Sequence, residues 1–298
     1  MKPRNLILAA VAAAILCAPV LAMGAKEPAT EKPLVAVSIL PQQYFVQRIA
    51  QDRVRALVLV GPGQSPHSYE PTPRQIADLG TAAAWFSIGV EFETALLPKI
   101  SGLYPDLRIV DTTNGVPSRL MTSHHHEGDV EDHEEEGGRD PHIWLGRAGA
   151  KAQAEYIRDT LSAVDPSGAS EYAQNCQELI QDIDSTFDAL KKSLEPLKGK
   201  PVFVFHPSFG YFLDEFGIEQ VAVEDQGKEP TQKGLAGLIA EAKEEGAKAI
   251  FVQPQFSQSA AKTVADAIGG VVVEINPLDA DWLENLRRLG AALETAVR

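Results

Sequence analysis

The chain has 298 residues, a formal net charge of −14 at pH 7 and a hydrophobic content of 44%. This length is enough for two domains of ordinary size, each with a normal hydrophobic core. The strong negative charge makes nucleic acid and anionic membrane surfaces poor candidate partners, whereas it favours cations.

Residues 1–25 have the features of a secretory signal peptide. Lys2 and Arg4 give a positive start, an apolar run follows from Leu6 to Leu16, and small residues lie around 22–25. Such a segment is cleaved on export, so we expect the mature protein in the periplasm or on the cell exterior. Cleavage leaves Cys176 as the only cysteine, and therefore no internal disulfide is expected.

From residue 34 onward, β-rich apolar runs alternate with amphipathic stretches. Strands are predicted at 34–40, 54–60, 84–88 and 108–110, and a helix is predicted at 42–50. Another helix is predicted to begin after Thr72, because Thr72 is a good N-cap, Pro73 suits the first helical position and Gln75 completes a capping box. Strands that alternate with helices predict a parallel sheet with helices packed on its faces.

Segment 167–197 is predicted to be one long amphipathic helix. Its apolar residues recur at steps of three and four and form one continuous stripe: Tyr172, Cys176, Leu179, Ile183, Phe187, Leu190, Leu194 and Leu197. A coiled-coil seam is the alternative, but the stripe spans only about four heptads. Because α/β patterns lie on both sides of it, a helix that joins two lobes is favoured.

After this helix the alternation resumes. Strands are predicted at 202–205, 218–223, 249–252 and 271–275, and helices at 231–245, 259–268 and 281–297. The predicted fold class is therefore α/β, with two α/β lobes that contain parallel-type sheets. The N-terminal lobe spans 33–165, the linking helix 166–198 and the C-terminal lobe 200–298.

Four of the seven histidines lie in one acidic stretch, at 122–138. They are His124, His125, His126 and His133. This composition cannot form a packed core, so we expect a mobile, exposed loop. The loop is a candidate secondary metal site, and a solvated run of charge is the alternative.

The other three histidines each lie at a predicted turn. His67 follows the strand that ends at Val60, His206 follows a strand in the second lobe, and His142 precedes a helix near Arg147. Ligands of open parallel sheets bind outside the carboxyl ends of the strands. Imidazole suits zinc, copper, nickel and iron, so the three histidines are candidates for one shared metal site. A structural role for each histidine separately is the alternative.

Several motifs resemble those of one family. They are PHSYEPTP at 66–73, DPHIWL at 140–145, FHPSFGYF at 205–212, EPT at 229–231 and the segment 250–256. With these motifs, the chain is similar to the periplasmic metal-binding receptors of ABC transporters, in the zinc-uptake, ZnuA-like branch. The resemblance extends from about Leu34 to the C-terminus.

The resemblance implies two lobes joined by a rigid helix, with the metal site in the cleft between them. It places metal ligands at His67, His142 and His206. Manganese-type relatives usually have a glutamate at the position of His206, and a histidine- and acid-rich loop is typical of the zinc branch. We therefore expect a monomer that captures zinc and delivers it to an ABC permease, without a nucleic-acid partner.

The fourth ligand departs from the family pattern. The family commonly has an aspartate at the end of the last strand, where this chain has Asn276. Asn276 can offer an amide oxygen, which carries no charge. The other candidates for the fourth ligand are Asp279, Glu70 and water. If Asn276 occupies the family's ligand position, Asn276→Asp is expected to tighten zinc binding.

Two other functions are consistent with some of these features. A manganese or iron receptor of the same family is one alternative. A zinc hydrolase is another, because three histidines with an open fourth position also describe catalytic zinc. The helical His-Glu-x-x-His signature of many zinc hydrolases is absent from the sequence, so a binding protein rather than an enzyme is predicted.

Overall fold

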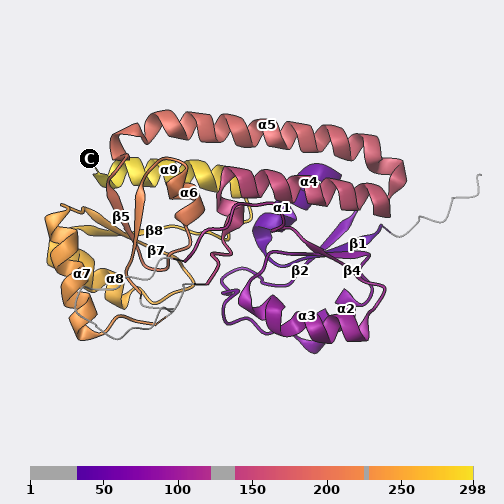
Figure 1. Cartoon of the computed structure of the whole chain (residues 1–298), viewed down its shortest axis with the longest axis horizontal. Coiled ribbons are helices and arrows are strands. Elements are labelled where there is room, and N and C mark those ends of the chain that lie inside the picture. The colour runs from indigo at the N-terminus through magenta and orange to yellow at the C-terminus, as the bar shows by residue number, and fades with distance from the viewer. Residues whose placement is uncertain (1–31, 122–137, 225–227, 298) are drawn as a thin grey trace, which may run out of the picture. The chain divides into compact units, whose positions relative to one another are not determined.

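The computed structural model describes residues 32–121, 138–224 and 228–297. Two parallel four-stranded sheets form its framework (Figure 1). The first sheet has the order β2-β1-β3-β4 and comprises β1 (Leu34–Val37), β2 (Arg55–Val58), β3 (Ala84–Ser87) and β4 (Arg108–Asp111). The second has the order β6-β5-β7-β8 and comprises β5 (Pro201–Val204), β6 (Glu219–Ala222), β7 (Ala249–Val252) and β8 (Val271–Glu274). The predicted class, two α/β lobes with parallel sheets, is confirmed.

The first sheet is accompanied by α1 (Leu40–Ala50), α2 (Pro73–Leu79) and α3 (Glu91–Leu103). The predicted capping box is present, since the side chain of Thr72 accepts the Gln75 N–H and the Gln75 side chain accepts the Thr72 N–H. The first strand was predicted to span 34–40, and its predicted end is wrong. It stops at Val37 because the Gln42 side chain accepts the Ser38 N–H, which turns the chain into α1.

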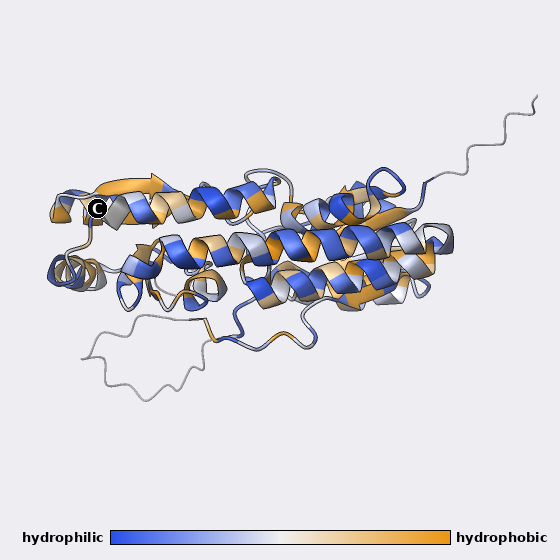
Figure 2. Cartoon of the chain, turned by 90° about the horizontal axis from the view of Figure 1, so that it is seen from above, coloured by the Kyte–Doolittle hydropathy of each residue, from blue (hydrophilic) through white to orange (hydrophobic). Residues whose placement is uncertain are grey.

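The helical middle of the chain consists of α4 (Arg147–Val164) and α5 (Ala169–Ser193), which lie side by side (Figure 1). The helix predicted at 167–197 is found as α5, with 3-10 turns at Pro166–Gly168 and Glu195–Leu197. Along its length α5 carries both hydrophilic and hydrophobic residues (Figure 2). Its apolar stripe is buried within this one chain, against α1, α4 and α9 (Trp282–Val297), so the stripe has intramolecular partners.

The second sheet is accompanied by α6 (Gly210–Asp214), α7 (Gln232–Glu244) and α8 (Ser259–Ile268). One hydrophobic cluster extends from Val35 in β1 to Leu293 in α9 and includes the stripe of α5. A smaller cluster joins one face of the second sheet to α7 and α8. The larger cluster therefore gives both sheets a common apolar support, which holds the ends of their strands in fixed positions.

Two predictions concern residues outside the described parts of the chain. They are the signal peptide at 1–25 and the loop with His124, His125, His126 and His133. In the described part, no helix combines the length and the apolar character that are needed to cross a membrane.

Candidate metal centre

The three histidines predicted as ligands come together from distant parts of the chain. His67 lies in the loop between β2 and α2, His206 follows β5, and His142 directly precedes the 3-10 helix η1 (Ile143–Leu145). Each offers one ligand atom, and these atoms all lie within 4.8 Å of one another. The ring centroids are 4.6 Å apart for His67 and His206, and 5.2 Å apart for His142 and His206.

Two of these imidazoles are almost inaccessible to solvent. His142 is 2% exposed and His206 is 5% exposed, whereas His67 is partly buried. Burial lowers the pKa of His142 to about 4, although Asp140 favours its protonation. A metal ligand must be a neutral imidazole, and burial keeps His142 in that form. The Nε2 atom of His206 is buried without a hydrogen-bond partner among the residues described, as expected for a nitrogen kept for a ligand.

Each histidine presents its other nitrogen, Nδ1, to a carboxylate oxygen. The pairs are His67 with Glu91 at 2.8 Å, His142 with Asp140 at 2.7 Å and His206 with Glu224 at 2.7 Å. A carboxylate at Nδ1 holds the proton there and directs the Nε2 lone pair toward a metal. Sequence reasoning did not identify these three acids as part of the site.

The Glu91 carboxylate is the most exposed of the three acids, with 57% of its side chain accessible. Burial of its remaining surface opposes ionisation, but the hydrogen bond from His67 outweighs this effect and lowers the pKa of Glu91 to about 2. Glu91 is therefore ionised at neutral pH. Its negative charge lies directly behind the His67 ring and favours a cation on the opposite side of that ring.

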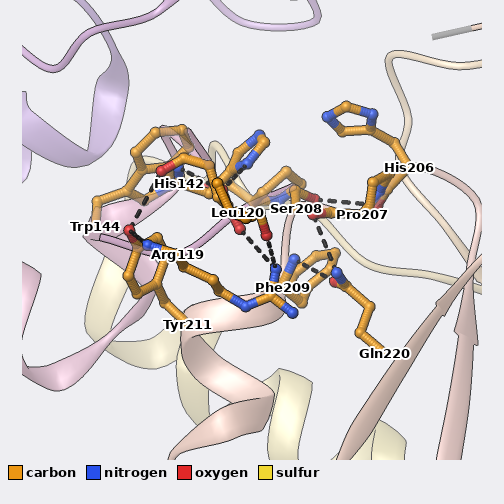
Figure 3. Close-up of polar contacts among 12 residues, drawn as sticks. Arg119, Leu120, His142, Trp144, His206, Pro207, Ser208, Phe209, Tyr211 and Gln220 are labelled. Carbon is orange, nitrogen blue, oxygen red and sulfur yellow. Dashed lines mark hydrogen bonds and ion pairs between the residues drawn. The ribbon is translucent and has the colours of Figure 1, made fainter. Parts of the chain in front are cut away.

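Asp140 connects the His142 ring to the second half of the chain. Its Oδ1 atom also accepts the backbone N–H of His142, at 2.9 Å, and its Oδ2 atom lies 3.2 Å from Nη1 of Arg119. Arg119 in turn donates from Nε to Asp214 of α6, at 2.8 Å. Figure 3 shows Arg119 between His142 and Tyr211, whose hydroxyl group accepts the Arg119 N–H. The orientation of His142 thus depends on contacts with α6.

His206 is fixed by the chain that follows β7. The Gln253 side chain accepts the His206 N–H at 3.1 Å and donates to the His206 carbonyl oxygen. The Phe256 ring stacks on the imidazole, with centroids 4.8 Å apart and planes inclined by 22°. Ser208, beside His206 in Figure 3, accepts a further hydrogen bond from Gln253. The ring of His206 therefore has little freedom to rotate.

A small cavity lies between the three rings. Besides the histidines, it is lined by Ser65, Pro66, Trp144, Gln255, Phe256, Pro277 and Leu278. Trp144 closes one wall, because its indole N–H donates to the Pro277 carbonyl oxygen at 2.8 Å. The walls are mostly apolar and come from both halves of the chain. Such walls exclude water and strengthen electrostatic interactions inside the cavity.

The candidates for the fourth ligand have other partners. The Oδ1 atom of Asn276 accepts hydrogen bonds from Gln255 Nε2 at 3.1 Å and from the Leu278 N–H at 3.0 Å. The Asp279 carboxylate accepts from Arg288 of α9 and from the Asp281 N–H, each at 2.9 Å. Glu70 is exposed and lines a different, open groove beside His67. The assignment of Asn276, Asp279 or Glu70 as the fourth ligand stays a prediction.

Residues 35–296 match the model of the ZnuA family, described as zinc-uptake complex component A, periplasmic. The chain belongs to the ZnuA family. Its sequence is 29% identical, over 286 residues, to the zinc-binding lipoprotein AdcA of Streptococcus pneumoniae (strain ATCC BAA-255 / R6). That match covers 94% of this chain but only 56% of AdcA, so the chain spans little more than half the length of this relative.

Two solved structures of ZnuA are similar to the whole described framework. A crystal structure of ZnuA superposes with a TM-score of 0.82 at 33% identity and covers 90% of this chain and 100% of the other. A ZnuA deletion mutant with zinc bound superposes with a TM-score of 0.81 at 33% identity and covers 89% and 98%. The resemblance inferred from the sequence motifs is thus confirmed at the level of the ZnuA family.

Proposed function

We propose that this ZnuA-family chain is an extracytoplasmic binding protein that captures one zinc ion between His67, His142 and His206. The observation that carries the proposal is the convergence of three ligand nitrogens within 4.8 Å, each on a ring held by a carboxylate. Tetrahedral zinc with Zn–N distances of about 2.0–2.1 Å would keep such nitrogens about 3.3 Å apart. Small side-chain movements are enough to reach that geometry.

The chemistry of the cavity favours zinc over manganese. Imidazole nitrogen suits zinc, whereas manganese prefers carboxylate, carbonyl and water oxygens. Three neutral imidazoles leave the double charge of the ion uncompensated inside a mostly apolar cavity. Glu91, Asp140 and Glu224 supply the opposing charge from behind the rings, so the ion is stabilised without a carboxylate in direct contact.

The same cavity supports a receptor more than a hydrolase. A zinc hydrolase needs a general base beside the metal-bound water. The described residues that line the cavity include no Asp or Glu, and the three nearby acids are engaged with histidine Nδ1 atoms. A zinc ion in this cavity can be bound, but a water molecule coordinated to it would have no general base beside it.

The remaining parts of the proposal rest on the family and on the sequence. We assign delivery of zinc to an ABC permease for import, a monomeric state, and export through a signal peptide at 1–25. We divide the chain into an N-terminal lobe at 33–165, a linking helix at 166–198 and a C-terminal lobe at 200–298. Binding of additional zinc to His124, His125, His126 and His133 is a separate proposal. Deletion of 122–138 should remove weak zinc sites and leave the tight site intact.

Competitive chelator titration tests the main assignment. The parent protein is expected to bind one zinc ion tightly, and His206→Ala should weaken this binding by several orders of magnitude because only two histidine ligands remain. The matched control is Gln258→Ala, at an exposed position two residues after Phe256. Parent-like affinity of His206→Ala, or tighter binding of manganese than of zinc by the parent, would reject the assignment.

A further inference from the structure

Gln255 is the one amide side chain among the described residues that line the cavity between the three histidines. It lies in the turn that follows β7, which is closed by a hydrogen bond from the Phe256 N–H to the Gln253 carbonyl oxygen at 3.1 Å. Its two neighbours in this turn, Gln253 and Phe256, are the residues that fix the His206 ring. Gln255 is therefore carried by the same rigid segment as one side of the metal site.

The hydrogen bonds of Asn276 determine which way the Gln255 amide is turned. The Asn276 side chain meets the backbone N–H of Leu278 at 3.0 Å, and a peptide N–H can only donate, so the atom it meets must be the oxygen Oδ1. The same oxygen lies 3.1 Å from the Gln255 amide. The Gln255 atom at this contact must therefore be the donor Nε2, and its carbonyl oxygen Oε1 points elsewhere.

The Oε1 atom of Gln255 is buried and has no hydrogen-bond partner within the described residues. A buried carbonyl oxygen without a partner is unfavourable, and a bound water or ion is one way in which such a group is satisfied. His206, another residue that lines this cavity, carries a second buried atom of this kind, Nε2. The two residues that carry this oxygen and this nitrogen thus line the same small cavity.

We propose that Gln255 Oε1 is the fourth zinc ligand and that Asn276 is a positioning residue, which holds the Gln255 amide through Nε2. This inference rests on the proposed capture of zinc by His67, His142 and His206. It replaces the expectation that Asn276 or Asp279 reaches the metal. The first shell is then three imidazoles and one amide oxygen, all neutral, and the compensating charge comes from the acids behind the histidines.

Four variants separate this assignment from a role of Asn276 as ligand. Gln255→Leu removes the oxygen with little change in volume, and Asn276→Ala removes the acceptor that orients it. Asn276→Asp keeps an oxygen that can accept both hydrogen bonds, from Gln255 and Leu278. The matched control is Gln258→Leu, at an exposed position three residues from Gln255. Zinc affinity is measured by competition with a chelator, and the fold of each zinc-free variant is checked by urea unfolding.

The expected pattern is specific to an amide ligand. Gln255→Leu and Asn276→Ala should each lose about tenfold or more in zinc affinity, whereas Asn276→Asp keeps the acceptor of Gln255 Nε2, adds a negative charge behind the amide and should bind zinc at least as tightly as the parent. In the zinc-bound parent, Oε1 should lie about 2.0–2.2 Å from the ion, located by its anomalous signal. This structural measurement stands even if Gln255→Leu fails to fold.

Two results would overturn the assignment while the proposed function stands. One is parent-like zinc binding by Gln255→Leu. The other is a zinc-bound structure in which water, Asn276 or Asp279 occupies the fourth position. A parent protein that binds no zinc would instead reject the proposed function itself. The experiment therefore distinguishes the two failures.

Discussion

The Nδ1 atom of His206 and the Oε1 atom of Glu224 are 2.7 Å apart, and both side chains are almost completely buried. Glu224 lies two residues after the end of β6, and His206 lies two residues after the end of β5, the neighbouring strand. Parallel pairing of these strands thus places an acid behind a candidate metal ligand. The pair sets the orientation of the ring and raises the electron density on its free nitrogen.

Glu224→Gln should therefore weaken zinc binding without removing a ligand. The neutral amide keeps the size of the side chain but loses the negative charge behind His206, and loss of such an outer partner typically costs 10–100-fold in metal affinity. Glu219→Gln, at the exposed start of β6, is the matched control and should bind zinc like the parent. Chelator competition measures both, and equal affinities for the two variants would show that the Glu224 charge has no role.

The sequence predicted the fold best where the signal is local. The capping box at Thr72 is complete within four residues, and β7 and α8 have the predicted bounds. His67, His142 and His206 could be selected because they follow strand ends or precede a helix, and because the surrounding motifs resemble a family. The convergence of their ligand atoms agrees with that selection.

Asp140 is only two residues from His142, but the other two acids behind the histidines, Glu224 and Glu91, could not be predicted in this way. Glu224 is 18 residues from His206, and Glu91 is 24 residues from His67, so only the packing of neighbouring elements brings them together. Glu91 begins α3, a helix that the sequence analysis did not predict. Pro98 lies inside this helix, and proline is a strong signal against a helix interior. Gln255 was missed because its orientation depends on Asn276 of another loop.

Arg119→Met should destabilise the zinc-free protein. Asp140 is completely buried, and its partners are Arg119 and His142. Removal of one partner from a buried ion pair leaves an uncompensated charge and typically costs about 3–5 kcal/mol. Arg158→Met is the control, because its pair with Asp159 lies at the surface and should contribute less than about 1 kcal/mol. Urea unfolding gives both values, and similar losses for the two variants would contradict the buried pair.

Gly149→Ala should disturb the segment that carries His142. A Cβ atom at Gly149 would lie 2.1 Å from the backbone carbonyl oxygen of Ile143, and backbone cannot move aside without displacing η1. We expect a loss of stability of about 2 kcal/mol or more, together with weaker zinc binding. Gly102→Ala in α3 is the control, because a Cβ atom there meets nothing within 4 Å. It should raise stability by about 0.5–1 kcal/mol, since alanine favours helix more than glycine does.

The last prediction concerns Glu93, which is completely buried beside the end of β3. Burial raises the pKa of Glu93 to about 7, against the opposing effect of hydrogen bonds from Ser38 and from the N–H groups of Ile88 and Gly89. A free glutamate releases its proton near pH 4.5. Between these two values the folded chain therefore holds more protons than the unfolded chain.

Stability contributed by Glu93 should consequently be greatest below pH 4.5 and decrease as the pH rises through about 7. The decrease is on the order of 3 kcal/mol, from a difference of between two and three pKa units. Glu93→Gln removes this titration, whereas Glu155→Gln, at an exposed position on α4, should leave it in place. Other acids contribute equally to all three proteins, so the free energy of unfolding of each zinc-free protein is compared across this pH range. In the parent and in Glu155→Gln, the free energy of unfolding relative to Glu93→Gln should decrease as the pH rises. If it does not decrease, Glu93 is ionised throughout this pH range in the folded state, because its hydrogen bonds outweigh the effect of burial.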